Sequence, residues 1–219
     1  MFVGHSGAGL LLPAIADAMT AKVAALVFVD AFLPPARGST RLLPSELMLH
    51  LRAPARGGVL SPWSKWFGEE AMRELVPDEA LRSSLEEEMT CLPLSYFEAD
   101  VSVPEAWTRG RCAYLLFSAG TYGKSAARTR ANGWAVREIP GAHHLLMVTE
   151  PVAVTVALLD LERQLLTATW RLRRRQPIEQ NNWRARRFGL GSAGQNPPGC
   201  DQIEFITAGA ISTPPILRA

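Results

Sequence analysis

A serine lies at the sixth position of the chain, between small residues in the stretch GHSGAG. Gly4, Ser6 and Ala8 fit a tight strand-to-helix turn, in which small neighbours let the serine oxygen stand clear of the sheet. The N–H groups at the start of the following helix can bind a negatively charged oxygen, and Gly7 is the candidate donor. The pattern therefore predicts a nucleophilic serine with an oxyanion-binding site beside it.

The same stretch has a second interpretation, a turn that binds phosphate. A dinucleotide-binding turn is followed about 20 residues later by an acid, and Asp30 stands at the end of the next apolar run. GHSGAG is shorter than the GxGxxG pattern, however, and the far end of the chain supplies a base suited to a serine. The nucleophile is therefore the favoured interpretation.

A serine nucleophile needs a base, and histidine is the usual one. The chain has four histidines. His50 lies in a predicted helix and His5 belongs to the turn itself, where it is a candidate substrate-binding residue. His143 and His144 lie in PGAHHLLMVTEP, a loop that leaves a predicted strand and enters the last predicted helix. A histidine there can reach back over the edge of the sheet to the serine.

Short apolar runs predict the strands that position these residues. The runs cover residues 1–5, 22–30, 112–120 and 134–141, and helical spacing is found over residues 7–20, 123–132 and 151–166. Strands that alternate with helices indicate an α/β fold with a mostly parallel sheet.

A long segment, about residues 31–111, departs from this alternation and contains helical stretches and many aromatic residues. An insertion of this length is typically a subdomain or lid, and Tyr96 and Phe97 are its candidate substrate-binding residues. We therefore predict an α/β domain over residues 1–166 with a helical lid insertion. Residues 167–219 form a basic tail with glycine and proline, which we predict to be disordered.

The composition restricts the function classes. With 219 residues, 47% of them hydrophobic, the chain can bury a core, and its net charge is only +2. Residues 163–219 contain nine arginines and three acidic residues, so the positive charge belongs to the tail. No nucleic-acid-binding motif accompanies it, and we expect no nucleic-acid partner. Three cysteines without metal-site spacing and no run long enough to span a membrane favour a cytoplasmic protein with no metal or cofactor.

Four features in this order, GHSGAG, VFVDAFLP, the long insertion and PGAHHLLMVTEPVAV, resemble the C-terminal part of the α/β-hydrolase superfamily, particularly its small esterase-like members. The resemblance covers about residues 2–163. It implies a partial α/β-hydrolase fold and a serine hydrolase that acts on a small ester or amide by Ser-His-Asp acyl transfer.

The resemblance also implies the roles of two further residues. In the family the base histidine stands seven positions before the proline that opens the last helix, which is His144 for Pro151, with His143 as the alternative. The acid usually follows the strand that here reads CAYLLFS, but the loop after it has no Asp or Glu. Some relatives carry the acid at the end of the preceding strand, where this chain has Asp30. A cap at the strand end is the other interpretation of Asp30.

The family resemblance places several strands and a second oxyanion donor before the serine turn, where this sequence has only Met1, Phe2 and Val3 ahead of Gly4. We therefore expect the hydrolase activity to be impaired and an exposed sheet edge to promote self-association. The alternatives are a non-catalytic hydrolase remnant that binds a ligand or partner, and an interaction protein that acts through its basic tail.

Overall fold

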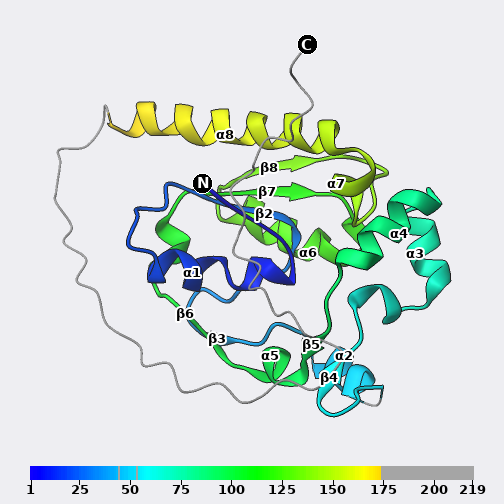
Figure 1. The fold of residues 1–219 in the computed structure, drawn as a ribbon. Coiled ribbons are helices and arrows are strands. Elements are labelled where there is room, and N and C mark those ends of the chain that lie inside the picture. Colours follow the sequence, from blue (N-terminus) through cyan, green and yellow to red (C-terminus); the bar gives the residue numbers. More distant parts are fainter. Residues whose placement is uncertain (44, 53, 174–219) are drawn as a thin grey trace.

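A four-stranded parallel sheet forms the centre of the protein (Figure 1). The structure, a computed structural model, describes residues 1–43, 45–52 and 54–173, so most of the predicted tail lies outside the described residues. The strand order is β1-β2-β7-β8. The strands are β1 (Phe2–Ser6), β2 (Leu26–Ala31), β7 (Cys112–Leu116) and β8 (Ala135–Glu138). The α/β fold class with a mostly parallel sheet is confirmed.

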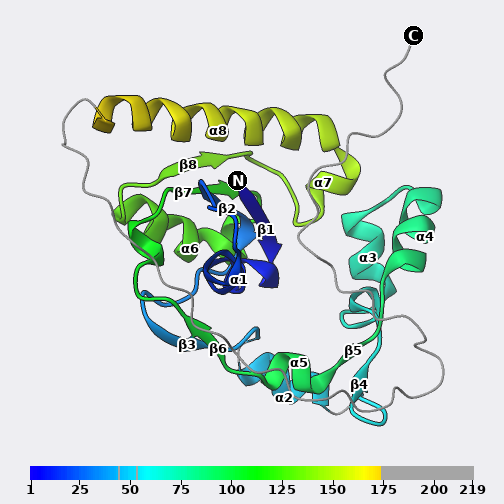
Figure 2. The same cartoon turned by 60° about the vertical axis from the view of Figure 1, so that its left-hand side comes forward.

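Every residue of β2 and β7 is buried, as continuous apolar runs predict for the middle strands of a parallel sheet. One face of the sheet, with Phe28 and Tyr114, packs against α1 (Leu12–Ala18) and α6 (Ala119–Ala131). The other face, with Val27 and Leu115, packs against α8 (Pro151–Arg173). Figure 2 shows these three layers, with α8 alone on its side of the sheet.

Most predicted elements occur with shifted ends. The helix predicted over residues 7–20 is a 3₁₀ turn, η1 (Gly7–Leu10), followed by α1. The helix predicted over residues 123–132 begins earlier, directly after β7. The last helix, α8, continues past residue 166 to Arg173, because good helix formers such as leucine and arginine follow there. The first residues of the predicted tail are therefore helical.

The insertion between β2 and β7 folds into short elements rather than an irregular loop. Its two ends are joined by an antiparallel pair of strands, β3 and β6, and a second small pair, β4 and β5, lies within it. Asp78 caps one of its helices by accepting a hydrogen bond from the N–H of Leu81 at 2.8 Å. The elements are β3 (Gly38–Thr40), α2 (Ser45–Arg52), β4 (Val59–Leu60), η2 (Trp63–Lys65), α3 (Glu69–Leu75), α4 (Glu79–Glu88), β5 (Leu92–Pro93), α5 (Leu94–Glu98), β6 (Val101–Val103) and η3 (Trp107–Arg109).

A short helix, α7 (Leu146–Thr149), connects β8 to α8 and completes the fold. In Figure 1 it lies beside α3 and α4 of the lid. Among the helices of the described residues, none is both long and apolar enough to cross a membrane.

Two apolar features remain exposed on this fold. Strand β1 pairs with β2 on one side and is an edge of the sheet. On α8, four large hydrophobic side chains are between 44% and 76% exposed: Val152, Val156, Leu159 and Leu166. An open strand edge and an apolar helix stripe are both typical contact surfaces.

We expect these features to drive reversible self-association of the purified chain. Replacing Val156 and Leu159 with lysine should shift the population toward monomer in sedimentation velocity, because a charge in the stripe opposes its burial. Thr155→Lys, at an exposed polar position of the same helix, is the matched control and should leave the distribution unchanged. A wild-type chain that stays monomeric at all concentrations would contradict the prediction.

Candidate active site

Ser6 lies at the end of β1, immediately before the 3₁₀ turn η1. Its backbone has φ of 56° and ψ of −128°, a conformation that non-glycine residues rarely adopt. Such strain costs about 1–3 kcal/mol and collects at functional sites, where the surrounding structure holds it. The predicted strand-to-helix turn is therefore present, and Ser6 occupies its strained position.

Two glycines allow the turn to pack closely. A Cβ atom on Gly4 would lie 2.8 Å from the Leu12 side chain, in the first turn of α1. A Cβ atom on Gly9 would lie 2.7 Å from the Cβ of Ala31 and 2.8 Å from the carbonyl oxygen of Phe32. All three distances are shorter than atoms tolerate, so the close approach of the turn to its neighbours requires glycine at these two positions.

Asp30 is fully buried at the end of β2, where the pairing with β1 shifts by one residue. His5 pairs with Val29 and Ser6 with Ala31, so Asp30 is the extra residue of a bulge, with φ of 40°. The Tyr114 hydroxyl accepts a hydrogen bond from the N–H of Ala31 at 2.9 Å and donates to the carbonyl of Ala31 at 2.5 Å. Tyr114 thus satisfies the backbone next to the bulge and fixes its shape.

The Asp30 carboxylate connects three parts of the chain. Its Oδ1 accepts hydrogen bonds from the N–H groups of Phe117 at 2.9 Å and Ser118 at 2.8 Å, and its Oδ2 lies 2.8 Å from Nδ1 of His144. Burial opposes ionisation, but the hydrogen bonds from His144 and from the two backbone groups hold the pKa of Asp30 below its usual value. The carboxylate is therefore charged, and His144 donates its Nδ1 proton to it.

The two neighbouring histidines have different surroundings. His144 is bound to Asp30, which leaves its Nε2 as the nitrogen able to accept a proton. His143 directs Nε2 to the Thr149 hydroxyl at 3.1 Å, and its buried Nδ1 has no partner among the described residues. Of the two alternatives, the geometry brings His144 to the acid.

His5 holds the loop that carries His144. Its Nε2–H donates to the carbonyl oxygen of His144 at 2.9 Å, and the two ring centroids are 4.3 Å apart. Burial, together with the nearby His144, lowers the pKa of His5 to about 4, so the ring is neutral. The sequence analysis assigned His5 to substrate binding, whereas this ring nitrogen is engaged by the protein backbone.

Tyr122, in the first turns of α6, is a site residue that the sequence analysis missed. Its ring stacks on His144 with centroids 5.2 Å apart and an interplanar angle of 15°, and its hydroxyl lies 3.4 Å from Ser6 Oγ. In the described part of the chain no hydrogen bond joins Ser6 to His144 directly. Tyr122 lies just after the strand CAYLLFS, and nothing in that local sequence indicates its contact with Ser6, which is 116 positions away.

Gly7, the candidate oxyanion donor, is the first residue of η1. The first N–H groups of a helical turn have no partner within that turn, so this backbone group is suited to bind an oxyanion beside Ser6. Among the described residues, no group of three or more His, Cys, Asp or Glu that could hold a metal ion occurs.

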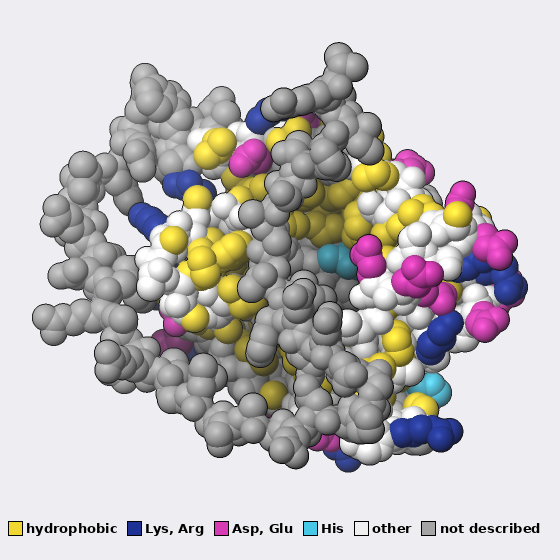
Figure 3. Space-filling model, in the orientation of Figure 1, with side chains coloured by type: hydrophobic (Ala, Val, Ile, Leu, Met, Phe, Trp, Pro, Cys, Tyr) yellow, Lys and Arg dark blue, Asp and Glu magenta, His cyan; other side chains and the backbone are white. Residues whose placement is uncertain are grey.

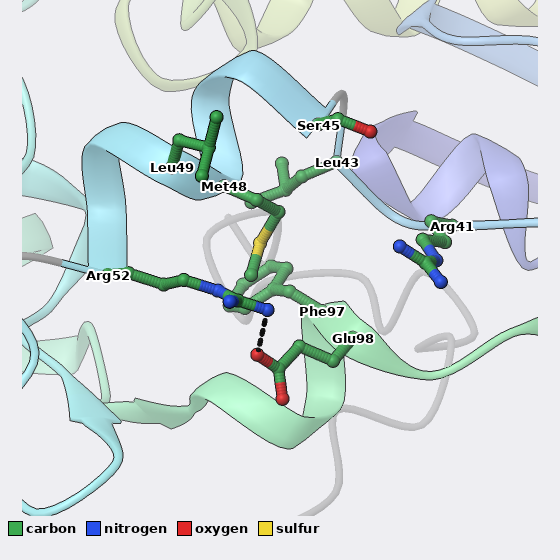
Figure 4. A pocket seen from close by; sticks show the side chains of 8 residues that line it. All are labelled: Arg41, Leu43, Ser45, Met48, Leu49, Arg52, Phe97 and Glu98. Carbon is green, nitrogen blue, oxygen red and sulfur yellow. Dashed lines mark hydrogen bonds and ion pairs between the residues drawn. The ribbon is translucent and has the colours of Figure 1, made fainter.

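The predicted substrate-binding residues of the lid, Tyr96 and Phe97, lie on α5. Phe97 is buried in the lid core and lines a cavity of about 200 Å³ (Figure 4). Arg52 and Glu98 form an ion pair of 2.7 Å at this cavity. Neither Ser6 nor His144 is among the lining residues, which are Arg41, Leu43, Ser45, Met48, Leu49, Arg52, Phe97 and Glu98. The cavity is therefore separate from the serine.

A different lid aromatic lies near the base. The ring centroid of Trp63 is 6.2 Å from that of His144. Trp63 also packs against a cluster in which Leu145, the residue after the base, is buried with Met72 and Val76. Figure 3 shows hydrophobic side chains around a recess between α8 and the helices α3 and α4, with a histidine inside it. Charged side chains gather on the outer side of these lid helices.

Comparison with known proteins identifies the family of this chain. A family model described as the alpha/beta hydrolase family matches residues 1–158. No significant match is found among curated proteins. Among solved structures, an extracellular alpha/beta-hydrolase from a Paenibacillus species has a TM-score of 0.55 at 15% identity, covering 73% of this chain and 70% of that chain.

Two further structures have similar folds. Tomato methylketone synthase I complexed with 2-tridecanone has a TM-score of 0.55 at 14% identity, covering 74% of this chain and 70% of that chain. Polyneuridine aldehyde esterase has a TM-score of 0.52 at 19% identity, covering 73% and 70%. At these identities the likeness concerns the fold.

The neutral His5 makes stability depend on pH. Because its pKa falls from 6.5 to about 4 on folding, the unfolded chain binds a proton between these pH values that the folded chain does not. The free energy of unfolding is therefore highest above pH 6.5 and falls as the pH approaches 4, by on the order of 3 kcal/mol. Urea unfolding at several pH values measures this loss.

Two variants isolate the contribution of His5. His5→Gln keeps a side-chain donor for the His144 carbonyl but does not titrate, so its stability should lose this part of the pH dependence. His50→Gln, at an exposed position of α2, is the matched control and should keep the wild-type slope. An unchanged slope in His5→Gln would show that His5 is not held neutral.

Proposed function

We propose that the chain, which belongs to the alpha/beta hydrolase family, is a serine hydrolase acting on a small ester or amide. The observation that carries this proposal is the hydrogen bond from His144 to the buried Asp30, beside a serine in a strained turn. A base held in one tautomer by a charged acid is what a serine nucleophile requires.

The reaction would proceed by acyl transfer. Ser6 Oγ attacks the carbonyl carbon of the substrate while His144 Nε2 takes the hydroxyl proton, and Asp30 stabilises the imidazolium that forms. The Gly7 N–H binds the negatively charged oxygen of the tetrahedral intermediate. His144 then gives its proton to the leaving alcohol or amine. A water molecule, activated by the same histidine, releases the acyl group from Ser6.

The Ser6 hydroxyl must turn toward His144 for the first step. Both residues contact Tyr122, Ser6 at its hydroxyl and His144 at the face of its ring. Hydrogen bonds between catalytic groups are often long or absent without substrate and tighten in the complex. The present geometry is therefore compatible with a reaction in which substrate binding brings the two groups together.

The recess between α8 and the lid supports an apolar substrate. It is lined mainly by hydrophobic side chains in Figure 3, and the Trp63 ring lies close to His144. An apolar wall next to the base favours a small ester or amide with a hydrophobic acyl or leaving group, because its burial contributes binding energy. A small-molecule substrate of this class is the partner that we propose.

A fluorophosphonate probe tests the proposed function, because it reacts covalently with an activated serine. We expect the purified full-length chain to be labelled at Ser6, as mapped by peptide mass spectrometry. Asp30→Asn should lower the labelling rate by about 10³–10⁴-fold, since the histidine then loses its charged partner and its preferred tautomer.

Ser6→Ala is the matched negative control and should abolish labelling. Circular dichroism establishes that each variant is folded. A folded wild-type chain that the probe does not label would contradict the proposal and favour a hydrolase-like protein that binds a ligand without turning it over.

A further inference from the structure

We propose that Tyr122 is a positioning residue of this site, whose hydroxyl donates a hydrogen bond to Ser6 Oγ and thereby directs the proton of Ser6 toward His144. The inference rests on the proposed function, because it assigns Tyr122 a part in activating the same serine. It concerns a residue that lies outside the Ser-His-Asp set.

The position of Tyr122 supports this role through two contacts. Its hydroxyl is 3.4 Å from Ser6 Oγ, and its ring is stacked nearly parallel on the His144 ring. Phe32 also packs against Tyr122, with ring centroids 5.0 Å apart, and only 7% of Tyr122 is exposed. One rigid side chain therefore contacts both the nucleophile and the base.

The direction of the hydrogen bond follows from acidity. A phenol is a stronger acid than an aliphatic alcohol, so a tyrosine hydroxyl is the better donor of the pair. Burial raises the pKa of Tyr122 further, although the hydrogen bond with Ser6 opposes this effect. The phenol therefore keeps its proton at neutral pH and remains a donor.

The hydrogen bond donated by Tyr122 affects both stages of the reaction, acylation and deacylation. An oxygen that already accepts from Tyr122 points its own hydrogen elsewhere, and His144, whose ring stacks on that of Tyr122, is the base that we propose to receive it. In acylation the Oγ–H proton moves to His144 Nε2 as the bond from Oγ to the acyl carbon forms. In deacylation that bond breaks and Oγ regains the proton from His144. Tyr122 retains its own proton throughout and stabilises the negative charge that develops on Oγ.

The contact between the hydroxyl groups of Tyr122 and Ser6 is long. Hydroxyl pairs are usually about 2.7–2.8 Å apart, so the separation of 3.4 Å is a weak hydrogen bond. Ser6 can therefore move toward a substrate carbonyl without first breaking a strong interaction. The hydrogen bond is expected to shorten as charge develops on Oγ, since bonds to charged acceptors are shorter and stronger.

Tyr122→Phe tests the hydroxyl while keeping the ring on His144. The rate constant for fluorophosphonate labelling should fall about tenfold, the factor expected for one hydrogen bond near 1.4 kcal/mol. With an ester substrate, kcat should fall by a similar factor while KM stays nearly constant, because the hydroxyl acts on the nucleophile. Labelling at the wild-type rate would overturn the proposal.

A second variant separates hydrogen-bond donation from packing. Replacing Tyr122 with 3,5-difluorotyrosine keeps the ring and the hydroxyl but makes the phenol more acidic. The labelling rate should then fall as the pH rises through the ionisation of the fluorinated phenol, a step that is absent in wild type over the same range. A pH profile that keeps its wild-type shape would show that the ring only fills space, and would overturn the proposal even if Tyr122→Phe folds poorly.

These measurements distinguish failure of this inference from failure of the proposed function. If the wild-type chain is labelled at Ser6 but the two Tyr122 variants react like wild type, the hydrolase stands and the role of Tyr122 is wrong. If the folded wild-type chain is not labelled, the proposed function itself is wrong and the role of Tyr122 fails with it.

Discussion

The site depends on the buried carboxylate of Asp30, because this one group joins three segments that are distant in the sequence. Asp30 is the last residue but one of β2, accepts two hydrogen bonds from the backbone after β7, and binds His144 in the loop before α7. A buried carboxylate without partners costs several kcal/mol, whereas each hydrogen bond to a charged group contributes about 1.5–3 kcal/mol. The ionised carboxylate is therefore stable only when all three segments are in place, and folding brings Asp30 and His144 together.

The backbone beside this carboxylate is strained, and particular side chains maintain the strain. Ser6 and Asp30 are the two non-glycine residues with positive φ among the described residues. The hydroxyl of Tyr114 satisfies both polar groups of Ala31 next to the bulge, and the missing side chain of Gly9 lets the serine turn approach that same residue. The strained residues Ser6 and Asp30 are thus neighbours on adjacent strands that share one packing arrangement.

Features with a local signal could be predicted from the sequence, and features made by distant contacts could not. The apolar runs predicted β2 and β7, and the end of the first run offered Asp30 as a candidate. The loop before the last helix offered His143 and His144, and the family resemblance favoured His144. Tyr122 carries no such signal, because its contact with Ser6 joins residues 116 positions apart. The aromatic residues of the lid predicted that the lid would form a packed subdomain. Which of these aromatic residues lies near His144 depends on the path of the insertion through space. That residue is Trp63 rather than Tyr96 or Phe97.

The lid supports the loop that carries His144 as well as covering the recess. Leu145 follows His144 directly and is buried among lid residues, including Met72 and Val76. Burying a leucine contributes about 1.5–3 kcal/mol, so separating the lid from this residue would release the loop that carries the base. On the other side of the loop, His5 binds the carbonyl of His144, and Asp30 binds its ring. His144 is therefore held by contacts from the sheet, the serine turn and the lid.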